Sequence, residues 1–185
     1  HRFVVNLIIT SCFSSGPAAQ DDSMTTTTTT MTSQHAEFHI APMQCYTNSP
    51  TRHLFHLLSP SCVKWTEMEK INDLFPKSES EPEQYLFQAL EKRLGPPQDY
   101  NEASHLVLQV GSNDPVRLQS CIEHATQRYS FREININCGC PSIESGGAAT
   151  YGASLMKDAS LTARLVESTR NALVTSSSSS SSSSS

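Results

Sequence analysis

Apolar positions form two alternating kinds of segment between about residues 37 and 175. Short, nearly continuous apolar runs with β-branched and aromatic residues predict buried strands, whereas apolar residues spaced three or four apart predict amphipathic helices. The predicted strands span residues 38–43, 62–68, 105–111 and 133–138. The predicted helices span residues 48–58 and 84–94, a segment that begins at Asp114-Pro115, and residues 159–173. Asp114 has the position of an N-cap, with Pro115 as the first helical residue.

These elements make four consecutive strand–helix units. Continuous apolar strands that alternate with amphipathic helices imply a parallel sheet covered by helices. A doubly wound sheet and part of a (β/α)8 TIM barrel both fit this alternation. Val174 and Thr175, which follow the last helix, resemble the start of a fifth strand.

Two homopolymeric runs lie outside the folding region, Thr25–Thr30 and Ser176–Ser185. Neither run offers apolar side chains to bury, so neither offsets the entropy lost on ordering. We therefore expect three parts: a disordered leader over residues 1–36, a folded segment over 37–175, and a low-complexity serine tail over 176–185.

Composition adds little about partners. The net charge is −5 and no dense stripe of Lys and Arg is present, so charge alone gives no support to nucleic-acid binding. No Cys-x-x-Cys pair occurs, so we expect no metal site. The same cysteine pattern favours a cytoplasmic or organellar setting over a disulfide-bonded secreted one. The apolar stretch 3–13 has the length of a signal-peptide core and is too short to cross a bilayer as a helix, so a transit peptide, a signal peptide and a leader without function all remain open.

Polar or chemically reactive residues follow three of the predicted strands. Pro42-Met43 ends the first, Gln109 lies near the end of the third, and Asn137 to Cys140 follow the fourth. The carboxyl ends of parallel strands lie at one edge of the sheet, where ligand sites form in such folds. These residues are therefore candidates for one shared site.

Two of the candidates have alternative interpretations. Cys140 lies between Gly139 and Pro141, which favour a tight turn that exposes the thiol, but most cysteines without a disulfide are small buried hydrophobes. Cys138 alternates with Cys140 and is expected to point the other way. The buried amide of Gln109 needs hydrogen-bond partners, which either a ligand or the backbone can supply.

Five motifs in this order resemble those of the tRNA-dihydrouridine synthase family. They are Ala41-Pro42-Met43, Trp65-Thr66-Glu67-Met68, Leu108-Gln109-Val110-Gly111, Ile134-Asn135-Ile136-Asn137-Cys138-Gly139-Cys140-Pro141-Ser142 and Gly152-Ala153-Ser154-Leu155-Met156. The resemblance covers residues 38–175. It departs from the family at Cys45-Tyr46-Thr47-Asn48, where the family often has Asp-Trp-Thr-Asp.

The resemblance implies the N-terminal part of a TIM-barrel domain that binds FMN, is reduced by NADPH and acts on tRNA. In such an enzyme hydride is added to C6 of a uracil, and a cysteine protonates C5. Carried over by motif, Cys140 is the proton donor and Asn137 contacts the target nucleotide, while Pro42, Met43, Gln44 and Gln109 contact FMN. A thiol suits the donor role because thiols are mostly protonated near neutral pH.

Other family residues on the flavin, its phosphate-binding turns and its RNA-binding domain lie beyond the region of resemblance. We therefore expect this fragment alone to bind FMN poorly and to lack synthase activity. Two other interpretations remain open: an FMN-barrel oxidoreductase acting on a small pyrimidine, and a catalytically inactive RNA-binding relative or fragment.

Overall fold

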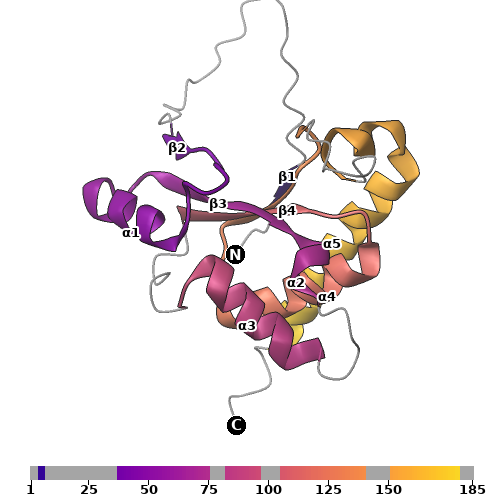
Figure 1. Cartoon of the computed structure of the whole chain (residues 1–185). Helices are drawn as coiled ribbons and strands as arrows, with labels where there is room; N and C mark the ends of the chain where they lie inside the picture. Colours follow the sequence, from indigo (N-terminus) through magenta and orange to yellow (C-terminus); the bar gives the residue numbers. More distant parts are fainter. Residues whose placement is uncertain (1–3, 7–36, 76–81, 97–104, 141–150, 180–185) are drawn as a thin grey trace, which may run out of the picture.

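A computed structural model of the chain describes residues 4–6, 37–75, 82–96, 105–140 and 151–179 (Figure 1). The central element is a five-stranded sheet in the order β1-β5-β4-β3-β2, with every neighbouring pair parallel. Its strands are β1 (Val4–Asn6), β2 (His39–Ile40), β3 (Val63–Lys70), β4 (Leu106–Gly111) and β5 (Glu133–Ile136).

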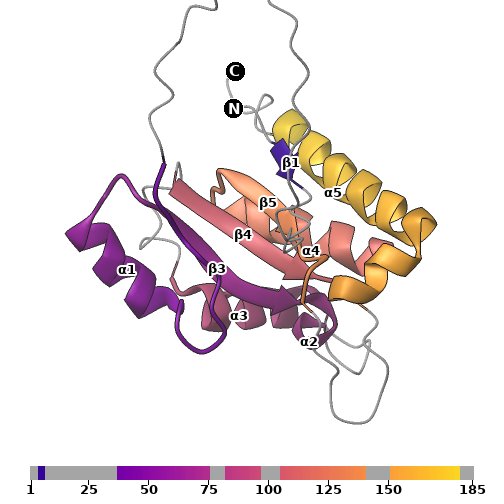
Figure 2. The same ribbon diagram turned by 90° about the horizontal axis from the view of Figure 1, so that it is seen from above.

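Helices lie mainly on one face of this sheet. Figure 1 shows the sheet nearly edge-on, with α2 (Ile71–Leu74), α3 (Pro82–Leu94) and α4 (Pro115–Arg128) on the same side. The long helix α5 (Ala159–Ser179) packs against α4, and α1 (Ser49–Leu58) lies beside the β2–β3 end of the sheet. Among the described elements, no helix crosses the opposite face, which is seen directly in Figure 2 and is called the open face below.

The strand order distinguishes between the two predicted architectures. Strands β2 to β5 are neighbours in the same order as in the sequence, whereas a doubly wound sheet reverses direction part-way. Sequential parallel strands with helices on one side are the arrangement of a (β/α)8 barrel, in which the open face becomes the interior. The structure therefore confirms the α/β class and is consistent with part of a TIM barrel.

Side chains of alternate residues in each strand point to opposite faces of the sheet. Leu106, Leu108 and Val110 of β4 lie in the large core cluster that includes the helices, together with Ile134 and Ile136 of β5. Val107 lies in a separate small cluster with Val63 and Trp65 of β3. This period-2 alternation assigns the remaining strand residues, Gln109 and Asn135 among them, to the open face.

Helix starts agree with the predicted capping signals. The side chain of Asp114 accepts hydrogen bonds from the backbone nitrogens of Val116 (3.0 Å) and Arg117 (3.1 Å). Asn48 caps α1 by accepting from the backbone nitrogen of Thr51 at 3.1 Å, so at this position the amide performs the capping that an Asp also provides.

Several elements differ from the prediction. β2 is shorter than the predicted strand 38–43, and β3 continues two residues further, to Lys70. The pattern did not predict the short helix α2 or the 3-10 helix η3 (Gly152–Lys157). It also gave no strand within the leader 1–36, where the structure has β1.

The expected fifth strand at Val174-Thr175 is wrong. Both residues belong to α5, which continues to Ser179 and so includes the first serines of the tail. A strand needs a partner for its backbone groups, and the edge of β5 that a following strand would use is paired with β1. Continuing the helix satisfies the same groups within one segment.

A β-bulge in β3 changes which residues face the open side. The register pairs Trp65 with Val107 and then Met68 with Gln109, so two residues of β3 oppose one of β4. A Cβ built on Gly111 would lie 3.2 Å from the Met68 sulfur, which places Met68 on the same face as Gln109 and Gly111. The bulge therefore brings Met68 to the open face.

Candidate active site

The candidate site lies on the open face, at the carboxyl ends of β4 and β5. Gln109 comes from β4, Asn135 from β5, and Asn137 from the residue that follows β5. In the parallel register Gln109 lies directly beside Asn135. The same alternation that buries Leu108 and Ile136 under the helices brings these three amides together.

Asn137 organises the turn that carries Cys140. Its Oδ1 accepts hydrogen bonds from the backbone nitrogens of Gly139 (3.0 Å) and Cys140 (2.9 Å). This is a side-chain mimic of a backbone turn, which Asn forms readily. Cys140 is half-buried, and Pro141 and Ser142 of the same motif lie outside the described residues.

Cys138 points away from this turn, as predicted from the alternation. It is 2% exposed and belongs to the core cluster beneath the sheet, where burial raises the pKa of its thiol. Cys121 on α4 is also buried there, and burial raises its pKa to about 12. Both thiols therefore lie in apolar surroundings, away from the open face.

Gln109 is 8% exposed, and its side chain bonds to other side chains rather than to the backbone. Its Nε2 donates to Oδ1 of Asn135 at 3.0 Å, and its Oε1 accepts from Nδ2 of Asn137 at 3.4 Å. Its backbone nitrogen donates to the hydroxyl of Thr66, at the β-bulge, at 3.0 Å. Gln109 thus links β3, β4 and the cysteine turn.

Gly152 closes the turn from the other side. Its φ is +68°, and the backbone nitrogen of Ala153 donates to the carbonyl oxygen of Cys140 at 3.0 Å. A Cβ on Gly152 would lie only 2.5 Å from that oxygen, so any side chain there would displace one of the two segments. The motif resemblance included Gly152, but this contact between distant segments is visible only in the fold.

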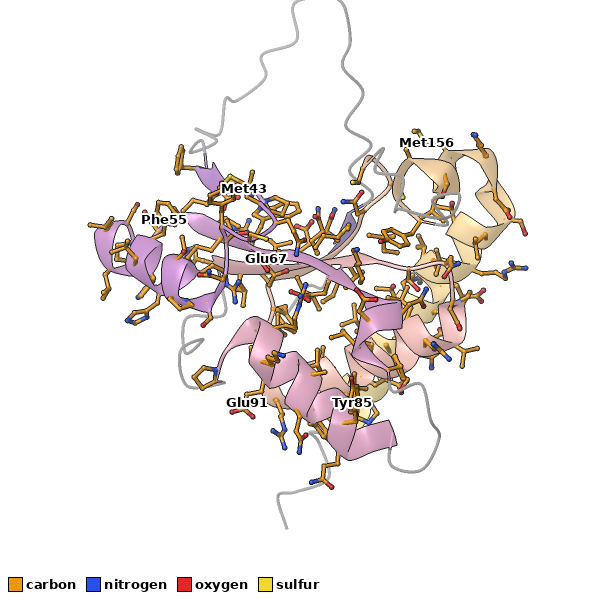
Figure 3. All side chains as sticks on the ribbon, viewed as in Figure 1. Met43, Phe55, Glu67, Tyr85, Glu91 and Met156 are labelled. Atoms are coloured by element: carbon orange, nitrogen blue, oxygen red, sulfur yellow. The ribbon has the colours of Figure 1, made fainter. Side chains whose placement is uncertain are left out.

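The turn that contains Pro42, Met43 and Gln44 follows β2. The carbonyl oxygen of Met43 accepts from the backbone nitrogens of Tyr46 (3.0 Å) and Thr47 (2.9 Å). Figure 3 shows Met43 on the opposite side of the sheet from Tyr85 and Glu91 of α3. Met43 is therefore on the side of the open face.

A buried arginine anchors that turn. The guanidinium of Arg52 donates to the carbonyl oxygen of Thr47 and, at 2.8 Å, to that of Leu94. Arg52 is 3% exposed, so these hydrogen bonds replace the water that its charge loses on burial. This contact ties the turn after β2 to the end of α3, a role that the sequence pattern did not indicate.

Two buried carboxylates near the end of β3, Glu67 of the Trp-Thr-Glu-Met motif and Glu69 just after it, interact with α3. Oε2 of Glu69 accepts from Nε of Arg93 on α3 at 2.7 Å, and Glu69 is 1% exposed. Burial raises the pKa of Glu69, with the Arg93 hydrogen bond acting in the opposite direction. Glu67 is also buried and interacts electrostatically with the same pair.

The open-face residues fit the edge of a flat heteroaromatic ring. A side-chain amide nitrogen carries two hydrogens, and Nε2 of Gln109 donates one of them to Oδ1 of Asn135. Nδ2 of Asn137 likewise donates one of its two hydrogens to Oε1 of Gln109. The remaining hydrogens can meet ring oxygens or nitrogens, while Met68 offers apolar surface beside them. Amide donors of this kind can pair with acceptor atoms at the edge of a ring ligand.

A separate apolar cavity of about 540 Å³ lies between η3 and α5. Leu155, Met156, Val166 and Cys138 contribute to its lining, and neither Gln109 nor Cys140 does. Within the described ranges, no group of three or more His, Cys, Asp or Glu side chains is arranged to hold a metal. In the same ranges no helix has the length and apolar character needed to cross a bilayer.

The chain is similar in sequence to one protein family and to several known proteins. Residues 39–177 match the model of a family described as dihydrouridine synthase (Dus). The chain is 33% identical over 128 residues to a tRNA-dihydrouridine(20/20a) synthase of Xanthomonas axonopodis pv. citri, covering 69% of this chain and 33% of that protein. It is 31% identical over 134 residues to a protein of the same name from Vibrio cholerae, covering 71% and 35%. The chain spans about a third of the length of these relatives.

Proposed function

This chain belongs to the dihydrouridine synthase family, and on that premise we propose that it carries part of the active site of an enzyme that reduces uridine in tRNA to 5,6-dihydrouridine. Because the chain spans about a third of its relatives' length, the activity is proposed for a protein in which this segment forms part of a complete barrel. The substrate is proposed from the names of these relatives.

FMN, reduced by NADPH, would supply the hydride that is added to C6 of the uracil ring. The residues proposed to hold FMN are Gln109, through the second hydrogen of Nε2, and the turn of Pro42, Met43 and Gln44 on the same side of the sheet. The donor set and the uncovered open face support this assignment. A ring lying there would be shielded from water once a complete barrel surrounds it.

Cys140 is the proposed proton donor. Hydride addition at C6 leaves negative charge on the C4–C5 side of the ring, and a positioned acid at C5 removes it. The two hydrogen bonds from Gly139 and Cys140 to Asn137 are the observation that carries this proposal, because they hold the thiol-bearing turn in one conformation. A fixed geometry of this kind is what proton transfer to one carbon requires.

Asn137 is proposed to contact the target nucleotide with the second hydrogen of its Nδ2. A uracil that reaches this amide must leave its stack, as in other enzymes that modify bases. The net charge of −5 indicates that attraction to the phosphate backbone comes mainly from outside this segment. The proposed contribution of this segment is therefore the chemistry and the contact with the base.

The test is a genetic complementation. The gene, with whatever coding sequence precedes or follows this segment, is expressed in a strain without dihydrouridine synthases, and tRNA dihydrouridine is measured by mass spectrometry. We expect restored dihydrouridine with the unaltered gene, loss with Cys140→Ala, and little change with Cys121→Ala, which removes a thiol buried under the sheet. Unchanged dihydrouridine in Cys140→Ala would refute the proton-donor assignment.

A second assay separates this function from reduction of a small pyrimidine. The purified product of the same gene is mixed with NADPH and with tRNA transcript, free uracil or orotate. Turnover with tRNA alone is expected. Turnover with a free pyrimidine alone would overturn the proposed substrate, and binding of tRNA without any turnover would identify an inactive RNA-binding relative.

A further inference from the structure

Three side-chain amides form an unbroken hydrogen-bonded chain that ends at the cysteine turn. Asn135 accepts from Gln109, Gln109 accepts from Asn137, and Asn137 accepts from the backbone nitrogens of Gly139 and Cys140. The first member, Asn135, has no part in the proposed chemistry. The series of hydrogen bonds through Gln109 and Asn137 nevertheless connects Asn135 to Cys140.

The orientation of every amide in the chain follows from the backbone. The two N–H groups of Gly139 and Cys140 can only donate, so the group of Asn137 that meets them must be its oxygen. Its nitrogen then points to Gln109 and requires an oxygen there. The nitrogen of Gln109 consequently faces Asn135, which must present its oxygen in turn. Rotating any one amide by 180° would set two donors or two acceptors against each other.

The hydrogen-bonded amides lie in buried surroundings, where such a mismatch of donors or acceptors costs free energy. Asn135 is 1% exposed and Gln109 is 8% exposed. In the sheet register Gln109 and Asn135 are direct neighbours on parallel strands, which places their side chains within the 3.0 Å of their hydrogen bond. The contact between Asn137 and Gln109, at 3.4 Å, is the longest in the chain and therefore depends most on the orientation of Gln109.

We propose that Asn135 is a positioning residue: by accepting from Gln109 it fixes the Gln109 amide, which in turn holds Asn137 and the Cys140 turn in the observed conformation. The same contact directs the remaining hydrogen of the Gln109 nitrogen toward the open face. That Cys140 donates a proton rests on the proposed function, whereas the positioning of its turn by Asn135 does not.

The test uses the whole 185-residue chain without flavin or RNA. Asn135→Leu keeps similar bulk and removes the acceptor, whereas Asn135→Asp keeps an oxygen acceptor for Gln109. Ile136→Val is the matched control, since it alters the next residue of the same strand but faces the helix-side core. Amide hydrogen exchange is measured by NMR at Gly139 and Cys140, and alkylation of Cys140 is followed by peptide mass spectrometry with the exposed Cys45 as internal reference.

In Asn135→Leu we expect exchange at Gly139 and Cys140 to be about five- to tenfold faster, the factor that corresponds to one ordinary hydrogen bond, while amides of α4 are unchanged. Cys140 should be alkylated faster relative to Cys45. Asn135→Asp should restore slow exchange, and Ile136→Val should leave both readouts at their original values. A purely structural role for Asn135 would instead change exchange equally throughout β5 and α4. That result, or unchanged exchange at Gly139 and Cys140, overturns the proposal.

A measurement on the unaltered chain covers the case in which Asn135→Leu does not fold. The amide hydrogens of Gln109 Nε2 should be distinct and slow to exchange, with a scalar coupling across the hydrogen bond to the Asn135 side-chain carbonyl. Rapid rotation of the Gln109 amide would contradict the proposal. Since none of these readouts involves tRNA or flavin, their failure and the failure of the proposed reaction are independent.

Discussion

The carbonyl oxygen of Cys140 lies against the α-carbon of Gly152, so close that a Cβ on Gly152 would be 2.5 Å from it. Gly152 has a φ of +68°, a conformation that costs any L side chain free energy as well as space. The turn with the candidate proton donor therefore depends on a glycine twelve residues further along the chain.

Gly152→Ala should accordingly destabilise the protein and displace the Cys140 turn. We expect a loss of about 1–3 kcal/mol in the free energy of unfolding, the range for a residue forced into a strained backbone conformation. Urea denaturation followed by circular dichroism measures this, and Cys140 alkylation reports the turn. The control is Gly111→Ala, whose new Cβ would meet side-chain atoms, the Tyr151 ring at 3.0 Å and the Met68 sulfur at 3.2 Å, rather than backbone, at a position without a positive φ. An equal loss in both variants would contradict this explanation.

The pair of Glu69 and Arg93 predicts a pH dependence of stability. Burial raises the pKa of Glu69 above its ordinary value of 4.5, so the folded state binds more protons than the unfolded state between those two values. The contribution of Glu69 to stability is therefore fully present below pH 4.5 and decreases as the pH rises through the raised pKa. Glu69→Gln should flatten this part of the stability curve, measured by urea unfolding across the pH range.

Glu37 provides a control of opposite sign for the Glu69 experiment. Its hydrogen bond with Arg132, at 2.8 Å, is the main cause that lowers its pKa. Any contribution from Glu37 is therefore present above pH 4.5 and is lost as the pH falls through the lowered value. Glu37→Gln should leave the slope above pH 4.5 intact. If Glu69→Gln also leaves that slope intact, Glu69 is not its source.

The purified 185-residue chain should contain little FMN and should not reduce tRNA uridine. The candidate flavin residues lie on the open face, which no described helix covers, so a bound ring would stay exposed to water on that side. The visible absorbance of the purified protein, compared with its protein concentration, measures bound flavin. Tightly bound FMN at one molecule per chain would show this expectation to be wrong.

In the 185-residue chain, strand β1 should protect the edge of β5 from association with other chains. Val4, Val5 and Asn6 pair in parallel with Glu133, Ile134 and Asn135, and thus occupy backbone groups that would otherwise form an exposed edge. Removing residues 1–8 should give concentration-dependent oligomers in sedimentation velocity experiments. A chain with Val4-Val5-Asn6 replaced by Gly-Ser-Gly keeps the length and should behave like the truncation. Identical sedimentation of all three proteins would contradict this role for β1.

Sequence patterns were sufficient for much of the fold and for part of the candidate site. The apolar periodicity of β4 and α4 and the capping signal of Asp114 are local properties, so they could be recognised without tertiary information. The motifs also brought Gln109, Asn137 and Cys140 into consideration, and the structure links the three by hydrogen bonds. Their chemical roles stay predictions. Asn135 could have been found by the same reasoning, because it alternates with Asn137 along the predicted strand 133–138.

Contacts between segments far apart in the sequence could be decided only by the tertiary structure. The β-bulge that turns Met68 to the open face depends on pairing with β4, and the extension of α5 through Val174 agrees with an edge of β5 already paired with β1. Cys140 was one of six cysteines by composition and a candidate donor by motif. Its surroundings, with Asn137 on one side and Gly152 on the other, come from the fold, because hydrogen bonding and packing between distant residues leave no periodic signal in the sequence.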